Sequence, residues 1–116
     1  MADLPFKAGD LCYFVMPVAD ADRAQSFYGG LLGWRFSPGN VPGGSNIEGV
    51  SPPGGMFEGG EGGPELYFMT DDLEAATARV RELGGEADEP QPTEGGRYSR
   101  CRDDQGARFG IWAPDA

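Results

Sequence analysis

The sequence has 116 residues, 20 of them Gly and 10 Pro, and its nine Lys and Arg against 19 Asp and Glu give a formal net charge of −10. A chain of this size buries one modest core, and its acidity argues against nucleic acids or anionic membranes as partners, because both are polyanions. The absence of His removes the usual metal ligand and the usual general base near neutral pH. No apolar run approaches the roughly 20 residues that span a bilayer, and no signal-peptide pattern opens the chain, so a cytoplasmic location is expected.

The first half of the chain is predicted to form a strand, a helix and three short strands. The apolar run at Leu11–Val18 is typical of a strand, and Asp20 after it is a typical helix N-cap. Gly33 stands where a left-handed cap ends the helix. The helix has apolar residues at steps of three and four, namely Ala21, Ala24, Phe27, Tyr28, Leu31 and Leu32. The strands that follow are expected at residues 34–37, 46–50 and 56–58.

The second half repeats this order. Residues 65–70 are expected to form a strand, Asp72 to cap a helix, and Gly84 with Gly85 to end it. The apolar stripe of this helix consists of Leu73, Ala76, Val80 and Leu83. Strands are expected at residues 86–88, 97–102 and 107–113, with a hairpin turn at residues 103–106.

The two halves form an internal repeat with a constant offset of 52 residues, which relates Tyr13 to Glu65, Asp20 to Asp72, and Gly33 to Gly85. We therefore expect one domain over residues 1–116 that contains two modules, at about residues 10–58 and 65–114. Residues 59–64, rich in Gly and Glu, are expected to link the modules.

Alternation along the strands divides their residues between two faces. The face that points away from the helices is expected to carry Tyr13, Val15, Tyr67 and Met69. The opposite face is expected to form core under the helices, with Phe14, Met16, Leu66 and Phe68. In the last hairpin, Phe109 and Ile111 are expected under the second helix, and the other face is expected to carry Tyr98, Arg100, Arg108, Gly110 and Trp112.

Some of these residues have two interpretations. Trp112 is either a stacking platform for a ligand or an anchor that closes the sheet. Arg100 either binds a carboxylate or phenolate of a ligand or forms a surface ion pair. Cys12 and Cys101 lack metal-site spacing and are too few for a disulfide scaffold, so we expect buried thiols in strands.

Three segments carry a resemblance to a known family: SFYGGLLGW at residues 26–34, DDLEAATARVRELGG at residues 71–85 and RDDQGARFGIWAP at residues 102–114. With the strand before each helix, the chain resembles the vicinal oxygen chelate superfamily, which includes glyoxalase I, extradiol dioxygenases, methylmalonyl-CoA epimerase and the bleomycin resistance proteins. The resemblance implies an α+β fold of two tandem βαβββ modules, whose curved mixed sheets form a concave cleft. It also implies a homodimer that completes the cleft.

Enzymes of this superfamily hold a divalent metal in the cleft, with ligands from the first and last strands of the modules. The resemblance places those positions at Tyr13, Gly55, Glu65 and Gly110. Glu65 is the one competent ligand for a hard metal among them, and a metal site needs three or four donors. We therefore expect no metal and no cofactor, and a likeness to the metal-free bleomycin resistance branch.

Two functions from different classes follow. The first is a metal-free protein that binds an aromatic antibiotic or natural product, in drug sequestration or in biosynthesis. Its ligand contacts are assigned to Tyr13, Val15, Glu65, Tyr67, Met69, Tyr98, Arg100, Arg108 and Trp112. The net charge favours a cationic ligand, and Arg100 argues against one. The second is a diverged glyoxalase-type lyase or isomerase, or a cofactor-free enzyme that uses Glu65 or Tyr13 for proton transfer. A third possibility is a dimeric module that binds no ligand.

Overall fold

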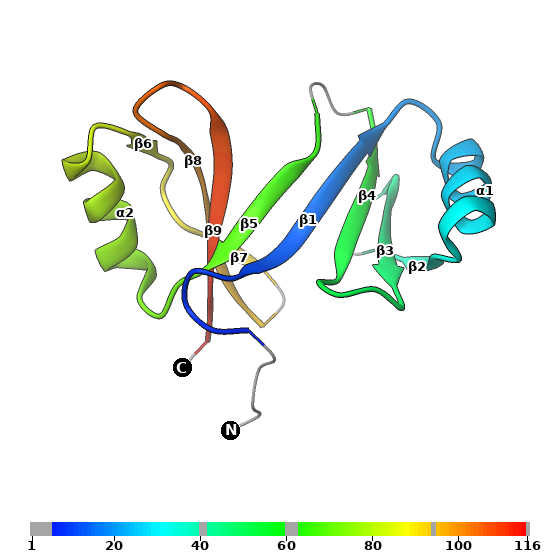
Figure 1. The fold of residues 1–116 in the computed structure, drawn as a ribbon, viewed down its shortest axis with the longest axis horizontal. Helices are drawn as coiled ribbons and strands as arrows, with labels where there is room; N and C mark the ends of the chain where they lie inside the picture. Colours follow the sequence, from blue (N-terminus) through cyan, green and yellow to red (C-terminus); the bar gives the residue numbers. More distant parts are fainter. Residues whose placement is uncertain (1–5, 40–41, 60–62, 94, 116) are drawn as a thin grey trace. The chain divides into compact units, whose positions relative to one another are not determined.

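The computed structural model describes residues 6–39, 42–59, 63–93 and 95–115, and it has an α+β fold (Figure 1). Within these residues it contains two helices and nine strands. The chain divides into two compact units, one formed by Tyr13–Glu65 and the other by the residues before and after that stretch. In each unit a helix packs beside a mixed sheet, as the repeat predicts. Residues 60–62 of the expected linker lie outside the described part of the chain.

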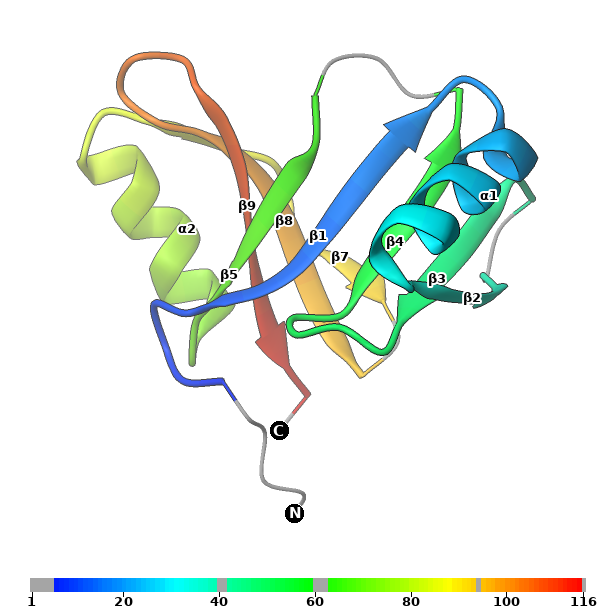
Figure 2. The ribbon, with the colours of Figure 1, turned by 45° about the vertical axis from the view of Figure 1, so that its right-hand side comes forward.

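The first unit contains β1 (Leu11–Val18, from Tyr13 on), α1 (Ala21–Leu32), β2 (Arg35–Pro38), β3 (Gly44–Glu48) and β4 (Gly54–Glu58). The strand order is β2-β3-β4-β1. The pair of β1 and β4 is parallel, and the other two pairs are antiparallel. The view in Figure 2 brings α1 in front of this sheet.

Both predicted caps of α1 are confirmed. The side chain of Asp20 accepts a hydrogen bond from the backbone N–H of Arg23 at 3.1 Å. Gly33 ends the helix with φ of 73°, in the left-handed region that a residue with a Cβ rarely adopts. A third contact comes from β4, where Glu58 Oε1 accepts from the backbone N–H of Ala21 at 2.9 Å.

Aromatic rings join α1 to its sheet. Trp34, just after the helix, stacks on Tyr28 with ring centroids 5.2 Å apart and an interplanar angle of 18°. The ring of Phe14 on β1 lies 5.7 Å from that of Trp34. Phe14 therefore points to the helix side of the sheet, as alternation predicts, and its neighbour Tyr13 points to the other side.

The second unit contains β5 (Glu65–Met69, from Leu66 on), α2 (Leu73–Glu82), β6 (Glu86–Ala87), β7 (Gln91–Thr93), β8 (Gly96–Arg102) and β9 (Arg108–Pro114). The strand order is β5-β9-β8-β6, and β7 pairs with β8. The sequence did not predict β7, because its three residues are exposed and include a proline, so they show no alternation of apolar and polar side chains.

The hairpin of β8 and β9 has the predicted turn. The backbone N–H of Asp103 donates to the carbonyl of Ala107 at 2.9 Å. The Asp103 carboxylate accepts from the backbone N–H groups of Ala107 and Gln105 at 2.9 and 2.8 Å, and these bonds lower the pKa of Asp103. The turn sets the register of the hairpin, in which Arg102 lies opposite Arg108.

The helix α2 covers the hydrophobic core of the second unit. The core consists of Leu73, Cys101, Ile111 and Ala113, with Ala76, Val80, Ala87 and Phe109 packed against it. This confirms that Phe109 and Ile111 lie on the α2 side of the sheet. Cys12 and Cys101 are both buried free thiols, as expected, and burial raises the pKa of each.

Other core predictions are wrong. Leu66 is 42% exposed, because α2 packs over β6, β8 and β9 and does not extend over β5. Phe14, Met16 and Phe68 are half-buried rather than buried. Leu83, the last residue of the predicted apolar stripe, is 61% exposed, because α2 already ends at Glu82.

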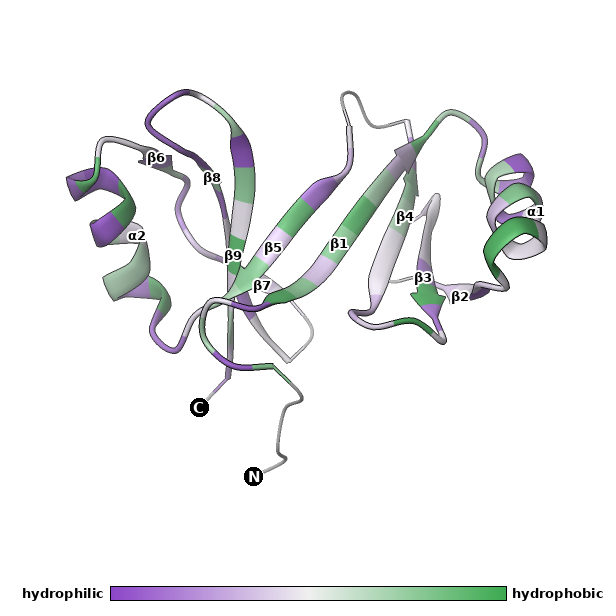
Figure 3. Cartoon of the chain, viewed as in Figure 1, coloured by the Kyte–Doolittle hydropathy of each residue, from purple (hydrophilic) through white to green (hydrophobic). Residues whose placement is uncertain are grey.

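The predicted apolar stripe of α1 is only partly packed. Phe27, Leu31 and Leu32 are 61%, 65% and 52% exposed, and no residue of the helix is buried. Figure 3 shows the hydrophobic residues at the end of α1. We call Phe27, Leu31 and Leu32 the α1 ridge. No described helix is long and apolar enough to cross a membrane.

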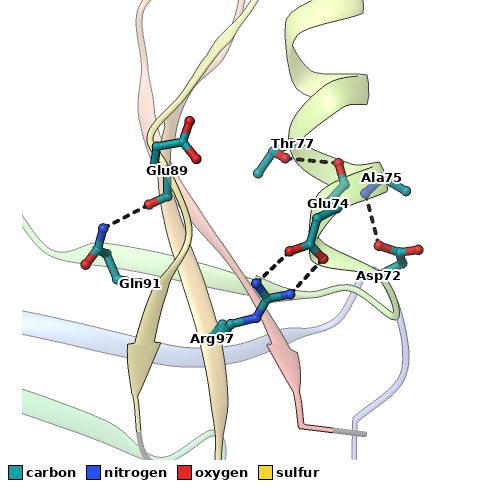
Figure 4. A network of polar contacts seen from close by, with 7 residues as sticks. All are labelled: Asp72, Glu74, Ala75, Thr77, Glu89, Gln91 and Arg97. Carbon is teal, nitrogen blue, oxygen red and sulfur yellow. Dashed lines mark hydrogen bonds and ion pairs between the residues drawn. The ribbon is translucent and has the colours of Figure 1, made fainter.

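One bidentate ion pair fastens α2 to β8 (Figure 4). The guanidinium of Arg97 contacts the two carboxylate oxygens of Glu74 at 2.6 and 2.7 Å, and it lowers the pKa of Glu74. The same turn of the helix is capped by Asp72, which accepts from the backbone N–H of Ala75 at 3.0 Å. The pair is exposed, so it contributes little to the stability of the fold.

Candidate ligand-binding face

Tyr67 and Gly110 lie on two neighbouring strands of the second unit's sheet, on the side that faces away from α2. They are register partners on the parallel strands β5 and β9. A Cβ atom at Gly110 would meet the ring of Tyr67, with Tyr67 Cγ at 2.9 Å. The ring of Tyr67 therefore packs over Gly110, in space that a side chain at position 110 would otherwise occupy.

Two more aromatic side chains lie on the same side. Tyr98 on β8 meets Tyr67 edge to face, with ring centroids 5.9 Å apart and an interplanar angle of 82°. Trp112 on β9 is the register partner of Tyr98, and its ring passes over Gly96, whose Cβ would lie 2.7 Å from Trp112 Cζ2. The guanidinium of Arg100 lies 5.9 Å from the ring centroid of Tyr98. We call Tyr67, Tyr98, Trp112 and Arg100 the aromatic face.

The accessible part of this face is smaller than the sequence predicts. Tyr98 and Trp112 are half-buried and Arg100 is exposed, so all three have surface left for a ligand. Tyr67 and Met69 are only 6% and 3% exposed. These two residues form a floor that supports the exposed rings and do not themselves offer contact area.

The first unit repeats the pairing of a tyrosine with a glycine. The hydroxyl of Tyr13 on β1 lies 2.5 Å from the place of a Cβ at Gly55. Val15, the register partner of Gly55, is half-buried, and so is Glu65 at the start of β5. Burial raises the pKa of Tyr13, so its hydroxyl stays protonated at neutral pH. This protonation argues against Tyr13 as a proton acceptor.

The residues present do not fit the divalent metal that the family resemblance implies. Gly55 and Gly110 have no donor atom in their side chains, and the tyrosines described above occupy the space that a ligand side chain would need. Glu65 is then the one carboxylate at the four positions. Within the described residues, no three His, Cys, Asp or Glu side chains come together to hold a metal ion.

Arg102 is a residue on this side of the sheet that the predicted site left out. Arg108, which the prediction did include, lies opposite it across the hairpin. Both have the same strand parity as the aromatic face, because Cys101 and Phe109 next to them belong to the α2 side. The sequence contains the information needed to include Arg102, because the turn at residues 103–106 pairs it with Arg108.

Comparison with known proteins places the chain in a family. The model of the glyoxalase-like domain matches residues 13–112, which include both modules. The chain belongs to the glyoxalase-like domain family, within the vicinal oxygen chelate superfamily. This glyoxalase-like domain is 28% identical over 131 residues to an anthracycline biosynthesis protein of Streptomyces peucetius, with 92% of this chain and 48% of that protein covered.

A protein of Mycobacterium tuberculosis that is named as a glyoxylase is also 28% identical over 125 residues, with 92% of this chain and 46% of that protein covered. The glyoxalase-like domain thus spans about half the length of these curated relatives. Among solved structures, methylmalonyl-CoA epimerase from Mycobacterium tuberculosis has a TM-score of 0.69 at 17% identity, with 99% of this chain and 94% of that chain covered. This likeness shows the fold.

Proposed function

We propose that this glyoxalase-like domain binds an aromatic antibiotic or natural product without a metal, in the cytoplasm, and releases it unchanged. The observation that carries the proposal is the aromatic face. Tyr98 and Trp112 offer half-exposed ring surface above a buried floor. Rigid rings on adjacent strands favour planar ligands. Each stacked ring pair adds about 0.5–1.5 kcal/mol to the binding free energy that comes from the buried area.

The relatives support this class of ligand. One of them is named for anthracycline biosynthesis, and anthracyclines contain fused aromatic rings. The glycines at the inherited ligand positions support binding over metal catalysis, because Gly55 and Gly110 leave their space to tyrosine side chains. The likeness to the bleomycin resistance branch, which the sequence suggests, is part of the same proposal.

Recovery of the ligand separates binding from catalysis. We expect that a planar aromatic antibiotic incubated with the protein co-elutes with it in gel filtration and has an unchanged mass after extraction. The alternative enzyme, with Glu65 as its proton acceptor, predicts a new product in the extract. Product formation that disappears in Glu65→Gln would replace the binding proposal by the enzyme.

We also propose that the protein is a homodimer in which the α1 ridge packs against a second copy. Three large apolar side chains on one helix are more than half exposed, and apolar side chains gathered in this way on a surface are typical of an interface.

Light scattering is expected to give twice the chain mass of 12.3 kDa. Replacing Phe27 and Leu31 by Ser is expected to shift the mass to that of one chain, because the new hydroxyls would need to be desolvated in the interface. Leu83→Ser is the control, since Leu83 is equally exposed on another helix end. A single-chain mass for the unmodified protein at micromolar concentration would contradict the dimer.

A further inference from the structure

A row of arginines continues the aromatic face toward the β8–β9 turn. Along this side of the hairpin, the paired residues are Tyr98 with Trp112, then Arg100 with Gly110, then Arg102 with Arg108. Three of the nine basic residues in a chain of net charge −10 therefore lie on one side of one hairpin. We call Arg102 and Arg108 the arginine pair.

The arginine pair has few acidic partners. The side chain of Arg108 is exposed and forms no hydrogen bond or ion pair with any described residue. Arg102 donates from Nη1 to the carbonyl of Gly106 at 3.1 Å and has further N–H groups to offer. Glu86, which lies opposite Arg102 on β6, forms no ion pair with it in the described part of the chain.

The turn carboxylate that follows Arg102 in the sequence is engaged elsewhere. Asp103 accepts hydrogen bonds from the backbone of its own turn. Two like charges directly opposite each other on antiparallel strands repel. An anion held between the two guanidinium groups would relieve that repulsion, and guanidinium groups bind carboxylate, sulfonate and phosphate oxygens in bidentate geometry.

The spacing fits a ligand with rings at one end and an acid at the other. The arginine pair lies four positions along the strand from the pair of Tyr98 and Trp112, a rise of about 14 Å. The long side chains of Arg102 and Arg108 span part of this distance. A system of two or three rings with an acidic substituent spans the rest.

We propose that the aromatic ligand carries an acidic group, and that the arginine pair binds this group while Tyr98 and Trp112 stack on the rings. This inference rests on the proposed function, because it assigns the charge of the ligand bound at the same face. It reverses the expectation of a cationic ligand that the net charge favours. Three arginines share this side of the hairpin although the chain as a whole is acidic.

Two fluorescent probes that differ by one acidic group test the proposal. Anilinonaphthalene sulfonate and neutral N-phenylnaphthylamine share the same ring skeleton. We expect the sulfonate to bind about tenfold more tightly, because charge-assisted hydrogen bonds to guanidinium are stronger than neutral ones. In the double variant Arg102→Gln and Arg108→Gln, we expect this ratio to fall to about two, with the affinity for the neutral probe unchanged.

The double variant Arg23→Gln and Arg35→Gln is the matched control, because it also removes two exposed positive charges and is expected to leave the ratio unchanged. A melting curve of each variant checks that the fold is intact. A ratio that stays near its original value in the folded double variant would overturn the acidic-ligand inference and leave aromatic binding standing. If Trp112→Leu leaves the affinity of both probes unchanged, the proposed function is overturned, and the inference with it.

Discussion

Gly110→Ala is expected to destabilise the protein by about 2–3 kcal/mol, which is a large effect for the addition of one methyl group. The new Cβ would meet the ring of Tyr67, which is only 6% exposed and packs inside the fold. The displaced ring would in turn disturb Tyr98, which it meets edge to face. Chemical denaturation with a fixed m-value measures the change.

A second substitution shows whether the ring is the cause. In the background of Tyr67→Ala, the same Gly110→Ala change is expected to be close to neutral, because the clash is removed. Gly30→Ala is the control, since no atom lies within 4 Å of its added Cβ, and we expect a gain of about 0.5–1 kcal/mol from helix propensity. A neutral Gly110→Ala in the unmodified protein would show that Tyr67 does not occupy this space.

Trp112→Leu is expected to weaken binding of anilinonaphthalene sulfonate by about 1–3 kcal/mol, the range typical of aromatic anchors in binding sites. Leucine keeps an apolar side chain on β9 but lacks the flat ring that stacks on the probe. Titration of the probe emission measures the affinity. Trp34→Phe is the control, because Trp34 stacks on Tyr28 beside α1 and is expected to have no part in binding. Equal affinities for all three proteins would place the probe elsewhere.

The sequence predicts most of the fold for identifiable reasons. Asp20 and Asp72 are helix caps whose side chains accept from backbone N–H groups, and this bonding is local and readable from residue type. The turn at residues 103–106 is equally local, and it determines the register of the whole β8–β9 hairpin. The faces of the strands then follow from alternation.

Coverage of those faces could not be predicted. Leu66 has the correct parity for the core and is still 42% exposed, because the lateral extent of α2 depends on how the helix packs and not on the alternation of β5. The α1 ridge has the same origin, since a helix stripe shows which residues are apolar and not what covers them. Tyr67 and Met69 show the reverse, being more buried than a ligand-contacting pair would be.

The sequence indicates which residues share the candidate face, but not how their side chains pack against one another. Alternation places Tyr98, Arg100 and Trp112 together, and the hairpin register confirms their common face. The packing of Tyr67 over Gly110 depends on side-chain rotamers and on the pairing of β5 with β9, which are far apart in the chain. No short-range pattern in the sequence reports such a contact.

The most direct test of the aromatic face uses the two indole N–H signals of the protein, which come from Trp34 and Trp112. In nitrogen-labelled protein, Trp34→Phe assigns the signals by removing one of them. On titration with anilinonaphthalene sulfonate, we expect the Trp112 signal to shift in proportion to saturation, with nuclear Overhauser contacts between probe and indole, while the Trp34 signal stays in place. A Trp112 signal that does not move while the probe binds would contradict ligand binding at the aromatic face.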